Sequence, residues 1–132
     1  MVMRAVAQPV QAPFTSLFVL RNADMQSTSD QAFTKTFNGT NYKITEIIAV
    51  RKTGGASVTC AGGVYDAASK GGNAIIANTQ SWVTLAANVN VVGTLAALVS
   101  TVLLSATPYL SLTTGSTAAC TADLFIMGYP ID

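Results

Sequence analysis

Short runs of alternating side chains, each ended by residues that favour a turn, recur along the sequence. In the run 32–37, Phe33, Lys35 and Phe37 alternate with threonines before Asn38-Gly39. A period of two is typical of a β-strand, and Asn-Gly accepts the positive φ of a tight turn between strands. Similar runs cover 14–21, 42–52, 57–66, 74–77, 81–85, 109–113 and 118–129. About eight to ten short strands predict an all-β, single-domain β-sandwich, and long connections between paired strands favour a jelly-roll-like topology.

Two segments leave the local structure open. In the run Tyr42–Lys52, Ile44 and Ile47 cannot share one face of a regular strand, so this strand is either buried on both faces or carries a β-bulge. Val89–Ala106 fits both strand and helical spacing. The overlapping uncharged segment Val89–Leu110 is the one candidate membrane span, but polar residues interrupt it and its flanks lack Lys and Arg. We therefore expect no membrane partner.

Residues 1–13 form a separate segment. They contain Pro9 and Pro13 and no periodic pattern, which predicts an extended N-terminal arm followed by the sandwich domain, residues 14–132. No signal peptide is expected, because the prolines interrupt this segment and no apolar core of sufficient length follows. A nearly uncharged arm becomes ordered by lying across a neighbouring molecule or by adding to the edge of a sheet.

The chain carries unusually little charge. Asp, Glu, Lys and Arg make up 10% of the residues, against roughly 25% in an ordinary soluble domain. No charged residue occurs from Gly71 to Ala122. Such a neutral surface is either covered by partners or solvated by uncharged polar side chains, and both fit a subunit of a larger assembly. The net charge of +1 and the scattered basic residues argue against a nucleic-acid partner.

The residue types that usually carry catalysis or hold metals are scarce. The chain has no histidine, the commonest general base and metal ligand near neutral pH. Its carboxylates are scattered, and its glycine pairs lack the Lys-Ser/Thr ending of a phosphate-binding loop. Cys60 and Cys120 lack metal-ligand spacing, so buried free thiols are expected, with a disulfide as the alternative. We expect no catalytic residue, no cofactor and no metal, and hence no enzyme.

Aromatic residues and the arm supply the candidate binding residues. Trp82, Tyr65, Tyr109 and Tyr129 could form a sugar-binding platform, anchor a protein interface or fill the core. The core is favoured for Trp82, and the role of the tyrosines stays open. The residues expected at an interface are Val2, Met3, Arg4, Val6, Pro9, Val10, Pro13, Phe14, Tyr109 and Tyr129.

Turn glycines and strand alternation combine in the segments 37–44, 61–65 and 70–72, and again in 108–114 and 122–128. Over Phe33–Gly128 these segments together resemble small virion structural proteins of tailed phages. The resemblance implies a fold similar to jelly-roll capsid decoration (cement) subunits, which are usually trimeric, or to some tail and fibre modules. It transfers no functional residue, because it includes no catalytic or ligand motif.

From this resemblance we expect a bacteriophage capsid decoration (cement) protein. It would brace major capsid proteins, or other virion proteins, through its arm and its sheet edges. We expect a homo-oligomer, a trimer, located in the virion after assembly in the host cytoplasm. The alternatives are a tail or head–tail connector component, a carbohydrate-binding module for host attachment, and a small membrane protein that uses Val89–Leu110.

Overall fold

The computed structural model describes residues 15–54, 59–86, 89–97 and 104–131, and within them it contains β-structure and no α-helix. The strands are β1 (Thr15–Asp24), β2 (Gln31–Ala32), β3 (Thr34–Lys35), β4 (Tyr42–Gly54), β5 (Ala61–Ala67), β6 (Gly71–Ile76), β7 (Val91–Val92), β8 (Tyr109–Thr114) and β9 (Cys120–Pro130). The predicted all-β fold is confirmed. The predicted arm, residues 1–13, lies outside the described residues.

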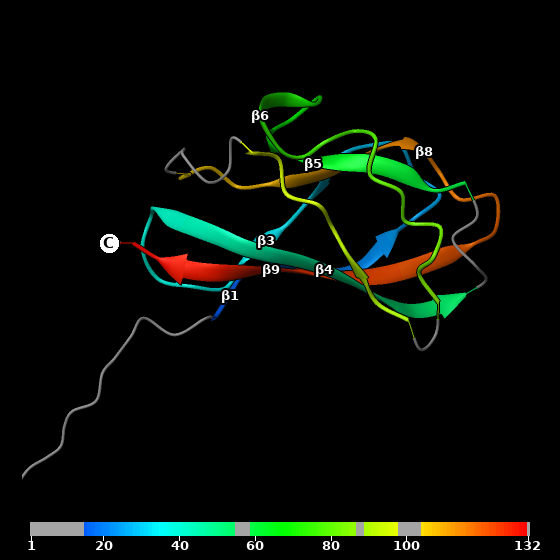
Figure 1. The fold of residues 1–132 in the computed structure, drawn as a ribbon, viewed down its shortest axis with the longest axis horizontal. Coiled ribbons are helices and arrows are strands. Elements are labelled where there is room, and N and C mark those ends of the chain that lie inside the picture. The colour runs from blue at the N-terminus through cyan, green and yellow to red at the C-terminus, as the bar shows by residue number, and fades with distance from the viewer. Residues whose placement is uncertain (1–14, 55–58, 87–88, 98–103, 132) are drawn as a thin grey trace, which may run out of the picture.

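The strands form two antiparallel sheets that lie face to face as two layers (Figure 1). Sheet A has five strands in the order β3-β1-β9-β4-β7, and sheet B has four in the order β2-β8-β5-β6. The first and last strands, β1 and β9, are neighbours in sheet A, and β2 and β8 are neighbours in sheet B. The two-residue β3 is an addition at the edge of sheet A. This nested order is that of a jelly roll. The predicted jelly-roll-like sandwich is therefore confirmed.

The pairing of β4 with β9 explains the irregular pattern of isoleucines in β4. The register shifts between Ile44 and Glu46, where Thr45 is the extra residue of a β-bulge. A bulge shifts the alternation by one residue. Consequently Ile44 and Ile47 both point into the core, with exposed fractions of 3% and 0%. Of the two readings that the sequence allowed, the bulge is the right one.

The core lies between the two sheets, and Trp82 is its largest fully buried side chain. Its indole Nε1–H donates a hydrogen bond to the carbonyl oxygen of Gly62 at 3.1 Å, so the one polar atom of the ring is satisfied. Phe18, Phe37 and Tyr42 pack edge-to-face, with ring centres 5.0 to 5.8 Å apart. The predicted core position of Trp82 is confirmed.

Three local expectations differ from the structure. Gly39 has the expected positive φ, +114°, but the strands on either side of Asn38-Gly39 pair with β1 and β9 and not with each other. Residues 81–85 form turns with a single bridging residue and not a strand. Within Val89–Ala106, the described residues contain β7 and no α-helix, and residues 98–103 lie outside the described part. Each of these cases depends on pairing between strands that are distant in the sequence. The intrinsic β-propensity of the residues does not indicate such pairing.

We find no helix, within the described residues, of a length and apolar character sufficient to cross a bilayer.

Candidate assembly surface

The carboxylates of Asp30 and Asp66 act in local structure. Asp66 accepts hydrogen bonds from the backbone and side-chain nitrogens of Asn73. Asp30 accepts a 2.6 Å hydrogen bond from the backbone N–H of Ser69, and this bond lowers the pKa of the Asp30 carboxyl. No cluster of three potential metal ligands occurs among the described residues. These carboxylates therefore order turns between strands.

The outer face of sheet A carries a row of apolar side chains that runs across four strands. The register places Val19 of β1 beside Phe125 of β9, Phe125 beside Ile48 of β4, and Ile48 beside Val92 of β7. We call these residues, Val19, Phe125, Ile48 and Val92, the outer stripe. Directly opposed residues in a sheet point to the same face. The outer stripe is therefore one continuous apolar band on the surface.

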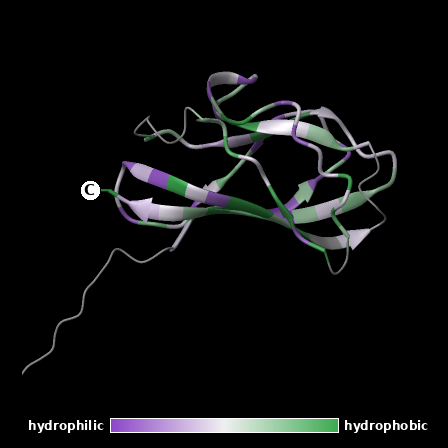
Figure 2. Cartoon of the chain, in the orientation of Figure 1, coloured by the Kyte–Doolittle hydropathy of each residue, from purple (hydrophilic) through white to green (hydrophobic). Residues whose placement is uncertain are grey.

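The burial pattern shows which way the outer stripe faces. The adjacent row, one residue along each strand, consists of side chains that point into the sandwich: Leu20, Leu124, Ala49 and Val91. Leu124, Ala49 and Val91 belong to the core cluster and Leu20 packs against it, whereas the four stripe residues do neither. Val19, Ile48 and Phe125 are half-buried, and 54% of Val92 is exposed. The outer stripe thus faces away from the core, and Figure 2 shows the hydrophobic middle of β4 to which Ile48 belongs.

The rows on either side of the outer stripe combine apolar and charged side chains. On one side Val50 lies beside Asp123, whose carboxylate Oδ2 is 3.3 Å from Arg21 Nη1. The Arg21 guanidinium also lies 5.3 Å from the centre of the Phe125 ring, within cation–π distance. On the other side Met127 lies beside Glu46. An apolar centre with a charged rim is the usual composition of a protein interface.

A hollow of about 370 Å³ adjoins the outer stripe at the short edge strand β3. Its lining comes from β1, from β3 and from the residue that follows β3, and consists of Val19, Leu20, Arg21, Thr34 and Thr36. Because β3 has two residues, it covers only a small part of the length of β1. The hollow extends the apolar band toward this edge of the sheet.

The structure separates the two tyrosines that we predicted at an interface. Tyr129 lies on β9 at an even spacing from Phe125 and is half-buried, so it belongs to the outer face of sheet A. Tyr109 lies on β8 in sheet B, where it pairs with Tyr65. The remaining predicted interface residues, Val2, Met3, Arg4, Val6, Pro9, Val10, Pro13 and Phe14, lie outside the described residues.

Sequence reasoning did not identify the outer stripe as a site. The pattern that indicates it is the presence of apolar residues on both faces of β4, where Ile47 points inward and Ile48 outward. A half-buried strand carries polar residues on its outer face. The excess of apolar residues in β4 was visible, but the alignment of Ile48 with Phe125 and Val19 depends on the register.

The structure contradicts a role for Trp82 in a sugar-binding platform, because this side chain has an exposed fraction of 0%. A platform needs an open aromatic face on which the sugar ring lies. Throughout the described part of the chain, every aromatic side chain is buried or half-buried. The carbohydrate-binding alternative therefore loses Trp82, one of the four aromatic residues considered for it.

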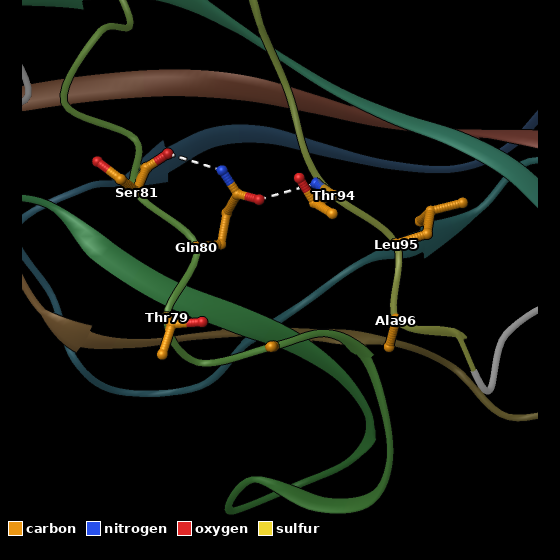
Figure 3. Close-up of a pocket in the computed structure, with 7 residues that line it drawn as sticks. Thr79, Gln80, Ser81, Thr94, Leu95 and Ala96 are labelled. Carbon is orange, nitrogen blue, oxygen red and sulfur yellow. Dashed lines mark hydrogen bonds between the residues drawn. The ribbon is translucent and has the colours of Figure 1, made fainter.

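A second hollow, of about 380 Å³, lies between the loops that flank β7 on its N-terminal and C-terminal sides (Figure 3). The side chain of Gln80 crosses it: Nε2 donates to the Ser81 carbonyl oxygen at 2.8 Å, and Oε1 accepts from the Thr94 backbone N–H at 2.7 Å. Both polar atoms of the amide are thereby engaged. Gln80 ties the two loops together, which is a structural role.

Comparison with known proteins gives no relative for this chain. No protein-family model, curated protein or solved structure matches it.

Both cysteines are buried free thiols, as predicted. We expect native Cys60 and Cys120 to react with a thiol reagent such as DTNB at pH 8 on the order of 100-fold more slowly than in guanidinium chloride. Burial raises the pKa of Cys60 to about 11, so at pH 8 very little of the reactive thiolate is present. Stopped-flow absorbance with and without denaturant measures the ratio. Equal rates in the two conditions would contradict the buried placement.

Proposed function

We propose that this chain is a structural subunit of a virus particle, a capsid decoration protein of the tailed-phage type. The observation that carries the proposal is the outer stripe, an apolar band on the outer face of a jelly-roll sheet. A sheet face that is exposed to solvent normally carries polar side chains, and a contiguous apolar patch marks a site of interaction. The outer face of sheet A is thus the surface that we assign to contact with neighbouring proteins of the particle.

The composition of the chain supports a protein that acts in many copies. With 10% charged residues, it has little of the charge that keeps soluble domains apart. Apolar contact over one sheet face binds weakly when a single copy is considered. On a particle, simultaneous contacts to several neighbours raise the effective affinity by orders of magnitude.

The step to a virion depends on two further observations. One is the strand order, which is that of a jelly roll, a fold used in capsid proteins and also in lectins, and the other is the sequence pattern of Phe33–Gly128, for which we propose a relationship to small virion proteins of tailed phages. A fold alone does not set a function. Trp82 is buried and no described aromatic side chain is fully exposed, which favours the structural role over the lectin role.

Substitution at the outer stripe is the direct test of this role. Val92→Asp is expected to lower the affinity of the protein for undecorated particles at least about tenfold, because a charge placed in an apolar contact loses its hydration. Co-sedimentation of purified protein with particles measures the affinity. Val83→Asp is the matched control, since Val83 is 45% exposed, similar to Val92 at 54%, and lies outside the outer stripe.

Two results would count against this function. Equal binding by the two variants would remove the outer stripe from the contact. Quantitative mass spectrometry of purified particles should find copy numbers that match the capsid lattice. A handful of copies per particle would instead place the protein in the tail or the head–tail connector.

A further inference from the structure

We infer that the outer stripe is the docking site for residues 1–13 of a neighbouring copy of this chain. The inference deepens the proposed function and rests on it, because it names one of the neighbouring proteins that contact this surface, a second copy of the chain. Neighbouring subunits would then be linked to one another in addition to the particle beneath them.

The composition of residues 1–13 matches an apolar band. In an extended chain, side chains at even spacing point to the same side. In an extended arm Val2, Val6 and Val10 would share one side, and Arg4, the one charged residue of the segment, would lie on that side as well. This side is complementary to an apolar surface that has, at its border, an acidic group without an ion pair among the described residues.

Glu46 supplies that acidic group. It is half-buried and lies two residues from Ile48 on β4, beside Met127, at the border of the outer stripe. Within the described residues no cation forms an ion pair with it: the one salt bridge there joins Arg21 to Asp123. A partly buried carboxylate gains from an added arginine, which binds carboxylates through two parallel hydrogen bonds. Arg4 is the cation that the arm brings.

The length of the arm is sufficient for the contact. An extended chain reaches at most about 3.3–3.6 Å per residue, so residues 1–14 span up to about 46–50 Å from Thr15. Strands lie about 4.8 Å apart, which makes the five-stranded sheet A about 20 Å wide. The arm can therefore cross the outer stripe and still leave residues to connect two subunits.

The two prolines of the arm favour packing on a sheet face. Pro9 and Pro13 have no backbone N–H and cannot donate a hydrogen bond to a neighbouring strand, whereas packing of side chains on a sheet face needs no such bond. Each proline also holds the residue before it in an extended conformation. Contacts from the arm of one copy to the face of the next are heterologous, and they form a ring such as the expected trimer where the rotation between copies closes.

Disulfide cross-linking in the full-length chain tests the contact. Val6→Cys in one protein and Val92→Cys in a second, mass-tagged protein are mixed and incubated with oxidised glutathione as the oxidant. We expect a disulfide-linked heterodimer of intermediate mass on non-reducing gels. Cys60 and Cys120 do not compete, because both are buried. Val83→Cys replaces Val92→Cys in the matched control and is expected to give at least fivefold less heterodimer.

A charge exchange separates specific docking from random collision. Arg4→Glu is expected to lower the heterodimer yield about fivefold, and Arg4→Glu combined with Glu46→Arg in the partner is expected to restore it. Equal yields at Val92 and Val83 would overturn the inference, as would the absence of any cross-link. A cross-link only within the Val6→Cys/Val92→Cys double variant would assign the outer stripe to the arm of the same copy. The copy number on the particle does not depend on this cross-link. A negative cross-linking result would therefore overturn the arm contact without overturning the proposed capsid function.

Discussion

Trp82→Ala is expected to lower the free energy of unfolding by about 3–5 kcal/mol, because it removes the largest buried side chain and leaves a cavity between the sheets. The change also deletes the indole N–H that satisfies the Gly62 carbonyl oxygen. An unsatisfied buried carbonyl costs about 1–3 kcal/mol. Small domains have total stabilities of about 5–15 kcal/mol, so this variant is expected to be close to unfolding. Urea denaturation monitored by far-UV circular dichroism, a backbone signal that does not need the tryptophan, measures the loss.

Two companion variants separate the contributions to this loss. Trp82→Phe retains most of the apolar volume and loses the hydrogen bond, so an intermediate loss is expected. Val83→Ala changes the neighbouring position, where 45% of the side chain is exposed, and is expected to stay within about 0.5 kcal/mol of the parent. A Trp82→Ala protein as stable as the Val83→Ala protein would contradict the assigned core position.

Gly128→Ala is expected to destabilise the fold by about 3 kcal/mol, because no space for a methyl group exists where β4 and β9 meet. A Cβ atom at Gly128 would overlap the Lys43 carbonyl oxygen and lie 2.9 Å from Leu17 Cδ1. The first of these atoms is backbone, so relief requires the two central strands of sheet A to move apart. Thermal or urea unfolding measures the effect.

Gly71→Ala is the matched control for this close approach. A Cβ atom at Gly71 would lie 3.1 Å from the Ala68 carbonyl oxygen and 3.6 Å from the Ala67 Cβ, which needs only a small adjustment at a turn. We expect a change of less than about 1 kcal/mol. Equal losses for the two glycines would mean that the spacing between β4 and β9 does not exclude a methyl group.

The edges of sheet A are short. Both edge strands, β3 and β7, have two residues each and sit beside much longer neighbours. Short edge strands limit open-ended pairing between sheets, which is a common route to aggregation. For a subunit of the proposed kind, this arrangement favours contact through the sheet face. Such contact depends on side chains and is therefore specific, whereas edge pairing uses backbone groups that any strand can match.

Much of the fold was predictable from local patterns. Alternation and turn residues located all the long strands, from β1 to β9, and the uncharged environment of Cys60 and Cys120 indicated buried thiols. The errors fall where partners are distant in sequence. Asn38-Gly39 is a good turn, but the strands around it pair elsewhere, since β1 and β9 lie beside them in sheet A.

The candidate site was less predictable than the fold. Sequence reasoning selected Tyr129, which lies on the outer face of sheet A, and Tyr109, which lies in the other sheet. It did not select Ile48 or Phe125. Each of these is an ordinary apolar strand residue until the register places them side by side.

The sequence alone therefore determined the secondary structure class, the sandwich and the scarcity of catalytic groups, because these follow from side-chain period, turn residues and composition. Only the tertiary structure decided that the bulge at Thr45 turns both Ile44 and Ile47 inward, and that Val19, Phe125, Ile48 and Val92 form one band. The physical reason is the period of two. A shift of one residue in any strand would move its apolar side chains to the opposite face, and that shift is set by pairing between strands far apart in the chain.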